Sequence, residues 1–377
     1  MAISNPTRRT RGFTLLEVMI AMALGLLVLA GAVMMYKDGL NASWMVTQRS
    51  EMQLEVRSAQ NMLTRDIRRA GFGLGSGGVA LVTGASRPIY GCDQNKCYVP
   101  AGNANPAGIQ YPYAPSSTTP WMYWLLPGYK QSAVINNSIG ANDAITVVYS
   151  DQATNFYSNL ANYTIAFNNA NGTSMTFTLK PSAQQIAPVR QLSDPVYGLK
   201  VGDLIYFTNS KAGVVQTAVG EVTTAPTGNS PYTVLFGDPD KLLMNQAAGT
   251  SSGLKQLATG TTTTATRIYV VTYYIDAQAN PSGNGNPTPR LMRQISGQTP
   301  YSISEYIVDL HFNYEFYDIN GTVSNSNGTT GLLNQLQRVD VNMTARSSLQ
   351  GINGYQGIQM NWTVGAQNLS FSNQYPQ

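Results

Sequence analysis

The feature that most constrains this chain is an apolar stretch near its N-terminus that contains a single charge. Residues 13–36 form a run of 24 residues in which Glu17 is the only charged side chain. At about 1.5 Å of rise per residue, a helix of this length reaches about 36 Å, which is enough to cross a hydrocarbon core of about 30 Å. The sequence therefore predicts a membrane-spanning helix.

The position of Glu17 calls for a positive partner, because a carboxylate in a membrane span costs up to about 3 kcal/mol at the bilayer centre. Three arginines lie in residues 8–11, just before the span, and positive residues stay on the cytoplasmic side. If a peptidase cuts between Gly12 and Phe13, the new amine lies four residues from Glu17, one helical turn away or within reach on a neighbouring copy. On this interpretation the segment is an assembly device.

The order of these residues resembles the class III signal of type IV pilins and pseudopilins. A basic leader is followed by Gly12, by the run Phe-Thr-Leu-Leu-Glu at 13–17 and by the apolar stretch. The resemblance implies that an inner-membrane prepilin peptidase cuts after Gly12 and methylates Phe13. It also implies that Glu17 neutralises the amine of an adjacent subunit when the helices stack into a filament.

Two other interpretations of the N-terminus stay open. An ordinary secretory signal ends in a small-x-small cleavage site, for which Ala30, Gly31 and Ala32 qualify, but its apolar core is shorter and needs no charge. A plain single-span anchor fits the length equally well. The anchor is compatible with the pilin interpretation, because a pilin is a single-span membrane protein before assembly.

The span continues into a second helical segment. No proline occurs from Lys37 to Ala70, and glycines crowd the chain from Gly71 onward, so the helix should end near Gly71. Apolar residues in this segment recur mostly at intervals of three or four and predict one buried face: Leu40, Trp44, Met52, Val56, Ala59, Leu63, Ile67 and Ala70. We expect a cleaved leader at 1–12, a span at 13–36, an amphipathic continuation at 37–71 and a globular domain at 72–377.

The globular part has the twofold period of β-strands. Segments rich in Val, Ile, Thr, Tyr and Phe predict strands, and Asn171 and Gly172 mark the turn of a hairpin. In the strongest pattern, Val308, Leu310, Phe312, Tyr314 and Phe316 share one face. We expect an α+β fold in which the helix covers a mainly antiparallel sheet, with strands at 143–149, 163–167, 174–179, 203–207, 267–275, 306–317 and 338–345.

The later part of the chain resembles the PilW minor pilins. The strand at 267–275 is followed by Pro-Arg-Leu-Met-Arg at 289–293, by residues 304–310 and by a Phe/Tyr-rich strand. The J-type pseudopilin of type II secretion shares this plan and is usually much shorter. PilW is therefore the preferred resemblance, and the long polar loops at 249–266, 277–288 and 320–331 look like exposed insertions.

Composition favours an exported structural protein. Charged residues make up only 11% of the chain, against about 25% in ordinary soluble domains. The net charge of +4 includes the three leader arginines, so removing the leader leaves 4 − 3, or +1. Electrostatic support for nucleic-acid binding is then largely lost, and no nucleic-acid partner is expected.

The two cysteines, Cys92 and Cys97, predict a local disulfide in an exported domain. Zinc needs about four ligands, which two cysteines and one histidine do not supply without carboxylates, so no metal or other cofactor is expected. Asp318, Asn320 and Gly321 have the alternating oxygen pattern of a calcium loop. An Asx/Gly turn is the favoured interpretation of these three residues.

Two patterns typical of enzymes lack the necessary context. Residues 73–78 fit the dinucleotide fingerprint but follow a helix instead of a strand. Residues 249–253 fit the nucleophile elbow, with Ser251 followed by Asp276 and His311 in hydrolase order, but no apolar strand precedes Ser251 and His311 lies on the polar face of a strand. We therefore do not expect an enzyme.

The sequence as a whole favours a minor pilin that primes or caps type IV pilus assembly. The resemblance implies an inner-membrane protein with a periplasmic domain that moves to the extracellular pilus, near its tip. Its implied partners are prepilin peptidase, other minor pilins, the major pilin, the inner-membrane assembly platform and a tip adhesin. The alternatives are a J-type pseudopilin and a membrane-anchored adhesion or binding module.

Overall fold

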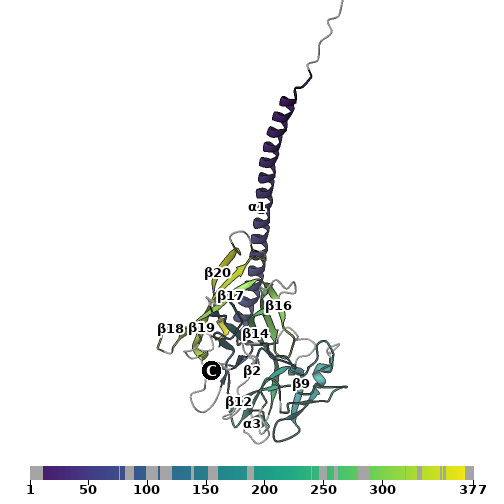
Figure 1. The fold of residues 1–377 in the computed structure, drawn as a ribbon. Coiled ribbons are helices and arrows are strands. Elements are labelled where there is room, and N and C mark those ends of the chain that lie inside the picture. Colours follow the sequence, from purple (N-terminus) through teal and green to yellow (C-terminus); the bar gives the residue numbers. More distant parts are fainter. Residues whose placement is uncertain are drawn as a thin grey trace, which may run out of the picture. The chain divides into compact units, whose positions relative to one another are not determined.

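The computed structural model forms two compact units, Met1–Glu51 and Met52–Gln377 (Figure 1). One long helix, α1 (Leu15–Arg69, 55 residues), begins in the first unit and ends in the second. The residues that the structure describes are 12–75, 77–80, 89–98, 109–110, 121–136, 140–151, 160–184, 191–238, 240–245, 253–258, 262–278, 288–318, 320–328, 333–348, 350 and 354–369.

Helix α1 ends where the sequence predicts, beside Gly71. Gly71 has φ = 74°, a left-handed conformation in which glycine carries no side-chain penalty and which commonly closes a helix. Its amide donates to the carbonyl of Val148 at 2.8 Å. A Cβ at this position would lie 3.1 Å from side-chain atoms of Trp124 and Leu369. Gly71 thus ends the helix and lets the chain turn tightly against the sheet.

Within the second unit, one face of α1 packs into the main hydrophobic core. Six of the eight apolar residues predicted for this face are buried, which confirms the helical period over 52–70. Leu40 and Trp44 are 45% and 60% exposed, so extending the buried face to them was wrong. Both residues belong to the first unit. The buried members are Met52, Val56, Ala59, Leu63, Ile67 and Ala70.

The main sheet has seven strands and is antiparallel at every pairing. Its order is β12-β11-β14-β15-β16, and β8 pairs with β14 and with β5. The long strand β14 is therefore central to the unit. The strand bounds are β5 Leu125–Gly128, β8 Ala144–Ser150, β11 Leu204–Lys211, β12 Val214–Glu221, β14 Thr264–Gln278, β15 Thr288–Ile295 and β16 Tyr301–Glu305.

A second, four-stranded sheet follows the main sheet in the chain, in the order β18-β17-β19-β20. The two sheets meet at Tyr306, which has φ = 61° and separates β16 from β17. Residues ahead of β8 also bond to β17: Asp143 accepts from the Phe312 amide at 3.0 Å, and Asn142 accepts from the Leu310 amide at 2.7 Å. These strands are β17 Ile307–Tyr317, β18 Val323–Ser326, β19 Leu336–Arg346 and β20 Gly357–Gly365.

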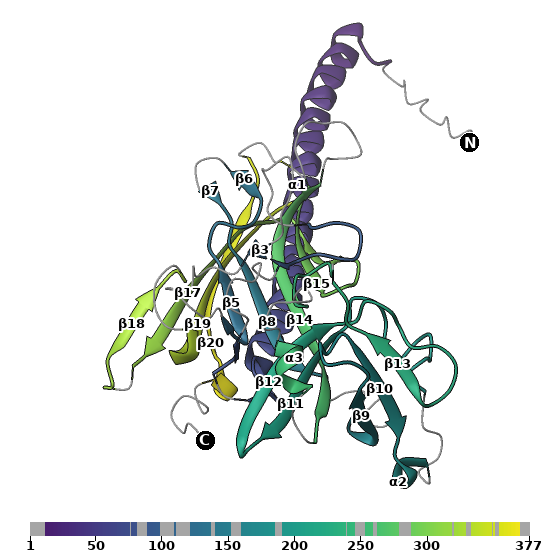
Figure 2. The same cartoon turned by 90° about the horizontal axis from the view of Figure 1, so that it is seen from below.

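A lobe with its own core is inserted between two neighbouring strands of the main sheet. The strands β8 and β14 are paired, yet 113 residues separate Ser150 from Thr264. This stretch contains β11 and β12 of the main sheet as well as the elements of the lobe. The lobe's apolar residues form a separate cluster that includes Phe177, Phe207 and Phe236. Figure 2 shows the lobe and the four-stranded sheet on opposite sides of β8 and β14. Its own elements are β9 Tyr163–Phe167, β10 Ser174–Leu179, β13 Tyr232–Leu235, the 3-10 helix Leu160–Asn162, α2 Pro181–Gln184 and α3 Gly253–Leu257.

Short elements complete the described part of the chain. Three two-stranded ladders pair β1 with β4, β2 with β3 and β6 with β7. These elements are β1 Val79–Ala80, β2 Ile89–Tyr90, β3 Ile109–Gln110, β4 Trp121–Met122, β6 Val134–Asn136, β7 Gly140–Ala141 and the 3-10 helix Leu333–Gln335.

The α+β class and all seven predicted strands are confirmed, and β9 and β10 form the predicted hairpin. One face assignment was wrong. Ile307 is buried and Val308 is only partly buried, because the ladder between β17 and β19 shifts register between Ile307 and Asp309. A β-bulge of this kind turns the residues on its far side to the opposite face. From Leu310 to Phe316 the predicted alternation holds.

A buried ion pair connects α1 to the main sheet. Asp66, which has no exposed surface, bonds to Arg293 of β15 at 2.8 Å, and the hydroxyl of Tyr273 in β14 donates to the same carboxylate at 2.6 Å. Burial, followed by the charge of Asp66, raises the pKa of Tyr273, which keeps this hydroxyl protonated. Arg293 also donates to Tyr149 at 3.2 Å and to Tyr301 at 2.7 Å. The helix is thereby held to four strands by one network.

Removing one member of this pair should destabilise the second unit strongly. Asp66→Ala leaves Arg293 buried without its counter-charge, a change that costs about 3–5 kcal/mol in comparable pairs. The measurement is the free energy of unfolding of the full chain in detergent micelles. Arg65→Ala is the control, since Arg65 is 54% exposed and exposed pairs contribute about 1 kcal/mol or less. Equal effects of the two substitutions would contradict the role of the network.

Candidate assembly site at the start of the N-terminal helix

The described chain enters α1 through three residues, Gly12, Phe13 and Thr14. Thr14 is the N-cap: the amide of Glu17 donates to its Oγ1 at 3.3 Å. The Glu17 carboxylate in turn accepts from the Thr14 amide at 3.0 Å and from the Thr14 hydroxyl at 3.1 Å. This reciprocal pattern is a capping box, which satisfies two amides that the first helical turn leaves without partners.

The capping box places the Glu17 carboxylate beside the predicted cleavage point. The amide that it binds belongs to Thr14, one residue after Phe13. Helix N-termini carry partial positive charge, so a carboxylate in the first turn is stabilised there. Cleavage between Gly12 and Phe13 would add a full positive charge one residue away from the bonded amide. The geometry thus brings together Glu17 and the peptide bond that the sequence marks for cutting.

The apolar part of α1 is exposed within the isolated chain. Phe13 is 86% exposed, and each Leu, Ile, Val, Met and Tyr side chain from Leu15 to Tyr36 is at least 47% exposed. The helix is long and apolar enough to cross a bilayer. Water is a poor solvent for so continuous an apolar surface, which marks lipid or neighbouring helices as its environment.

The start of the chain also matches a known sequence motif. Residues 7–33 match the prokaryotic N-terminal methylation motif. This segment is a type IV pilin-like prepilin signal. It supports processing by prepilin peptidase, anchoring in the membrane before assembly, and assembly with other pilins or pseudopilins. No curated protein and no solved structure matches the chain.

The cysteines Cys92 and Cys97 form a disulfide. Cys92 is fully buried, and its carbonyl accepts from the side chain of Gln294 in β15 at 2.6 Å. Between the cysteines, Asp93 accepts from the amides of Asn95 and Lys96, both at 2.7 Å. The loop is thus fixed both covalently and by hydrogen bonds against the main sheet.

Asp318, Asn320 and Gly321 form an Asx turn in the structure. The Asp318 carboxylate accepts from the amides of Asn320 at 2.9 Å and Thr322 at 2.7 Å, and Gly321 has φ = 84°. The bond from Thr322 is the chief cause that lowers the pKa of Asp318. Within the described ranges no group of three or more His, Cys, Asp or Glu side chains is placed to hold a metal ion.

The hydrolase-like residues are engaged in other contacts where the structure describes them. Asp276 bonds to Arg290 at 3.1 Å. His311 lies between Asp143, at 3.4 Å, and Asp309, at 2.9 Å. Hydrogen bonds first with Asp143 and then with Asp309 raise the pKa of His311 to about 10, so His311 is a cation paired with two carboxylates. Ser251 lies outside the described residues.

Two parts of this arrangement were missed by the sequence analysis. The N-cap at Thr14 could have been predicted from the sequence, since Thr-x-x-Glu before an apolar run is a capping box. No sequence pattern predicts the pairing of Asp66 with Arg293, because the two residues are 227 positions apart and an acidic residue in a helix more often faces solvent.

Removing the cap should loosen the first turn of α1. Thr14→Val keeps the side-chain size and removes the hydroxyl, at a cost of about 1 kcal/mol. Amide hydrogen exchange of the full chain in micelles should then accelerate about fivefold at Glu17 and Val18. Thr47→Val is the control, because Thr47 lies inside α1 and only donates to the Ser43 carbonyl at 3.1 Å. Unchanged exchange at Glu17 in Thr14→Val would contradict the cap.

Proposed function

We propose that this protein is a minor pilin of the PilW type that primes or caps a type IV pilus. Its mechanism is assembly and not bond making. The observation that carries the proposal is the methylation motif over residues 7–33, followed by an apolar helix whose side chains are exposed from Leu15 to Tyr36. A large antiparallel β domain in the second unit supplies the surface that such a subunit presents outside the membrane.

In the proposed sequence of events, the helix first holds the chain in the inner membrane with its globular domain in the periplasm. Prepilin peptidase cuts after Gly12 and methylates Phe13. Glu17 then pairs with the amine of a neighbouring subunit, which sets the axial register while apolar helix faces bury one another. The subunit joins other minor pilins and the major pilin on the assembly platform, and remains at or near the pilus tip beside an adhesin.

The J-type pseudopilin of a type II secretion system is the alternative, because the methylation motif is common to both classes. The length of 377 residues and the inserted lobe favour the larger PilW type. Genes for several short proteins with the same Gly/Phe/Glu start beside pilus genes would support a pilus. The same set beside secretion genes would favour the pseudopilin.

The test of the proposal is Glu17→Ala. Without the carboxylate, the amine of Phe13 has no partner in the filament, so incorporation into pili should fall to background while membrane insertion is retained. Immunoblots of sheared pili and of membranes measure the two fractions. Glu51→Ala is the matched control, since Glu51 is an exposed glutamate in the same helix, and its incorporation should equal wild type. Equal pilus numbers and equal incorporation in Glu17→Ala would rule out the proposed mechanism.

A further inference from the structure

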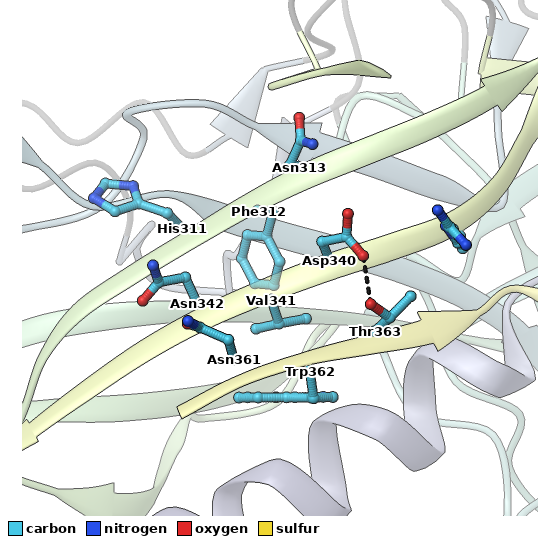
Figure 3. Close-up of a pocket in the computed structure, with 10 residues that line it drawn as sticks. His311, Phe312, Asn313, Asp340, Val341, Asn342, Asn361, Trp362 and Thr363 are labelled. Carbon is cyan, nitrogen blue, oxygen red and sulfur yellow. Dashed lines mark hydrogen bonds between the residues drawn. The ribbon is translucent and has the colours of Figure 1, made fainter. Parts of the chain in front are cut away.

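The four-stranded sheet carries a hollow on its polar face. The hollow has a volume of about 650 Å³ and lies over three adjacent strands, β17, β19 and β20. Figure 3 shows its polar side chains and the bond between Asp340 and Thr363. Nothing in the proposed assembly mechanism uses this surface. Its lining residues are His311, Phe312, Asn313, Arg338, Asp340, Val341, Asn342, Asn361, Trp362 and Thr363.

The strand register arranges the polar side chains in two rungs. In the first, Asn342 of β19 lies opposite His311 on one side and Asn361 on the other. In the second, Asp340 lies opposite Asn313 and Thr363. Strands are about 4.8 Å apart and successive same-face rungs about 7 Å apart. The two rungs therefore cover an area comparable to one or two sugar rings.

The pairing of β17 with β19 is irregular at both ends of the hollow. Register shifts occur at both ends of β17, between Ile307 and Asp309 and between Glu315 and Phe316. Such shifts bend strands and increase their twist. The regular segment between the two shifts carries His311 and Asn313, which line the hollow.

The charges at the two ends of the hollow are already paired. Arg338 bonds to Glu315 at 2.5 Å, and His311 lies between Asp143 and Asp309. Asp340 is therefore the one charge in the lining without an oppositely charged partner among the described residues, and it accepts from the Thr363 hydroxyl at 2.6 Å. An anionic ligand would meet this carboxylate, whereas a neutral hydroxyl can donate to it.

Two carboxamides of the lining have no hydrogen-bond partner among the residues that the structure describes. Among the described residues, no hydrogen bond joins the side chain of Asn313 or of Asn361 to another residue. Each carboxamide offers two donors and an acceptor. With the Asp340 carboxylate between them, the surface presents donors and acceptors side by side, which matches the vicinal hydroxyls of a sugar. Under the hollow β19 is paired with β17 on one side and with β20 on the other. A peptide that added as a strand to the edge strand β20 would lie beside the hollow and not over it.

We propose that this hollow is a binding site for a neutral saccharide. Hydroxyls of the sugar donate to Asp340 and accept from Asn313 and Asn361. The site is open and dominated by exchangeable hydrogen bonds, each contributing about 1 kcal/mol net, so its affinity lies in the millimolar range. Binding this weak is reversible, so the surface of the four-stranded sheet can bind and release a glycan repeatedly.

The test uses the full chain in lauryldimethylamine oxide micelles, because detergents with sugar headgroups would compete. Saturation-transfer difference NMR is measured with lactose, maltose and chitobiose at millimolar concentrations. 3′-Sialyllactose, which adds an anionic sugar to lactose, and trialanine serve as comparison probes. At least one neutral disaccharide should give a transfer signal. No signal from the three disaccharides, or a signal only from sialyllactose or trialanine, overturns the proposal.

Variants locate the site. The double substitution Asn313→Ala and Asn361→Ala removes two side chains that bond to no other described residue, and should weaken the disaccharide affinity about fivefold or more. Asn325→Ala is the matched control, because Asn325 lies opposite Glu315, on the same face but outside the hollow. The affinity of this variant for the disaccharide should equal that of the wild type. Equal thermal unfolding of the three proteins verifies the fold. A double variant that binds like wild type overturns the proposal.

Discussion

The buried pair of Asp66 and Arg293 fixes the register of α1 on the main sheet. The buried apolar face of the helix makes non-directional contacts that alone would tolerate sliding. The other polar contacts are at its margin: Trp362 donates to the Thr64 hydroxyl at 3.1 Å, and Asn368 donates to the Arg68 carbonyl at 3.0 Å. A charge pair in a dry core tolerates one arrangement, because any shift leaves a charge without its partner. The tyrosines at 149, 273 and 301 surround the arginine and satisfy its donors. The position of the helix therefore depends on a polar network inside an apolar interface.

The same physical rule acts at the other end of α1. Glu17 is an acid in an apolar segment, and its environment must supply a positive or donor partner. In the uncut chain Thr14 supplies donors through the capping box. A filament of neighbouring helices would offer the amine of Phe13 as a stronger partner. Each end of the helix thus contains one acid that needs a partner: Asp66 has it in the main sheet, and for Glu17 we propose the amine of a second subunit.

Periodicity predicted the elements whose burial follows the local sequence. The buried face at 52–70, the strands and the end of the helix at Gly71 all have local signals. The lobe between β8 and β14 was not foreseen, because strand pairing over 113 intervening residues leaves no local trace. Val308 was misplaced for a related reason, since a bulge reverses faces without changing the alternating pattern. At the candidate site, the order of residues in the sequence predicts the roles of Gly12, Phe13 and Glu17. The partners of Asp66 and His311 depend on tertiary contacts, which the sequence does not show.

We propose that cleavage before Phe13 converts a membrane-anchored chain into a subunit that stacks through Glu17. The most direct test is the intact mass of the mature protein, purified from membranes of cells with active prepilin peptidase. We expect a chain that begins at Phe13 and carries one additional methyl group. A chain that begins beyond Ala32, as after an ordinary signal peptidase, or one that keeps Gly12 and the residues before it, would contradict processing by prepilin peptidase.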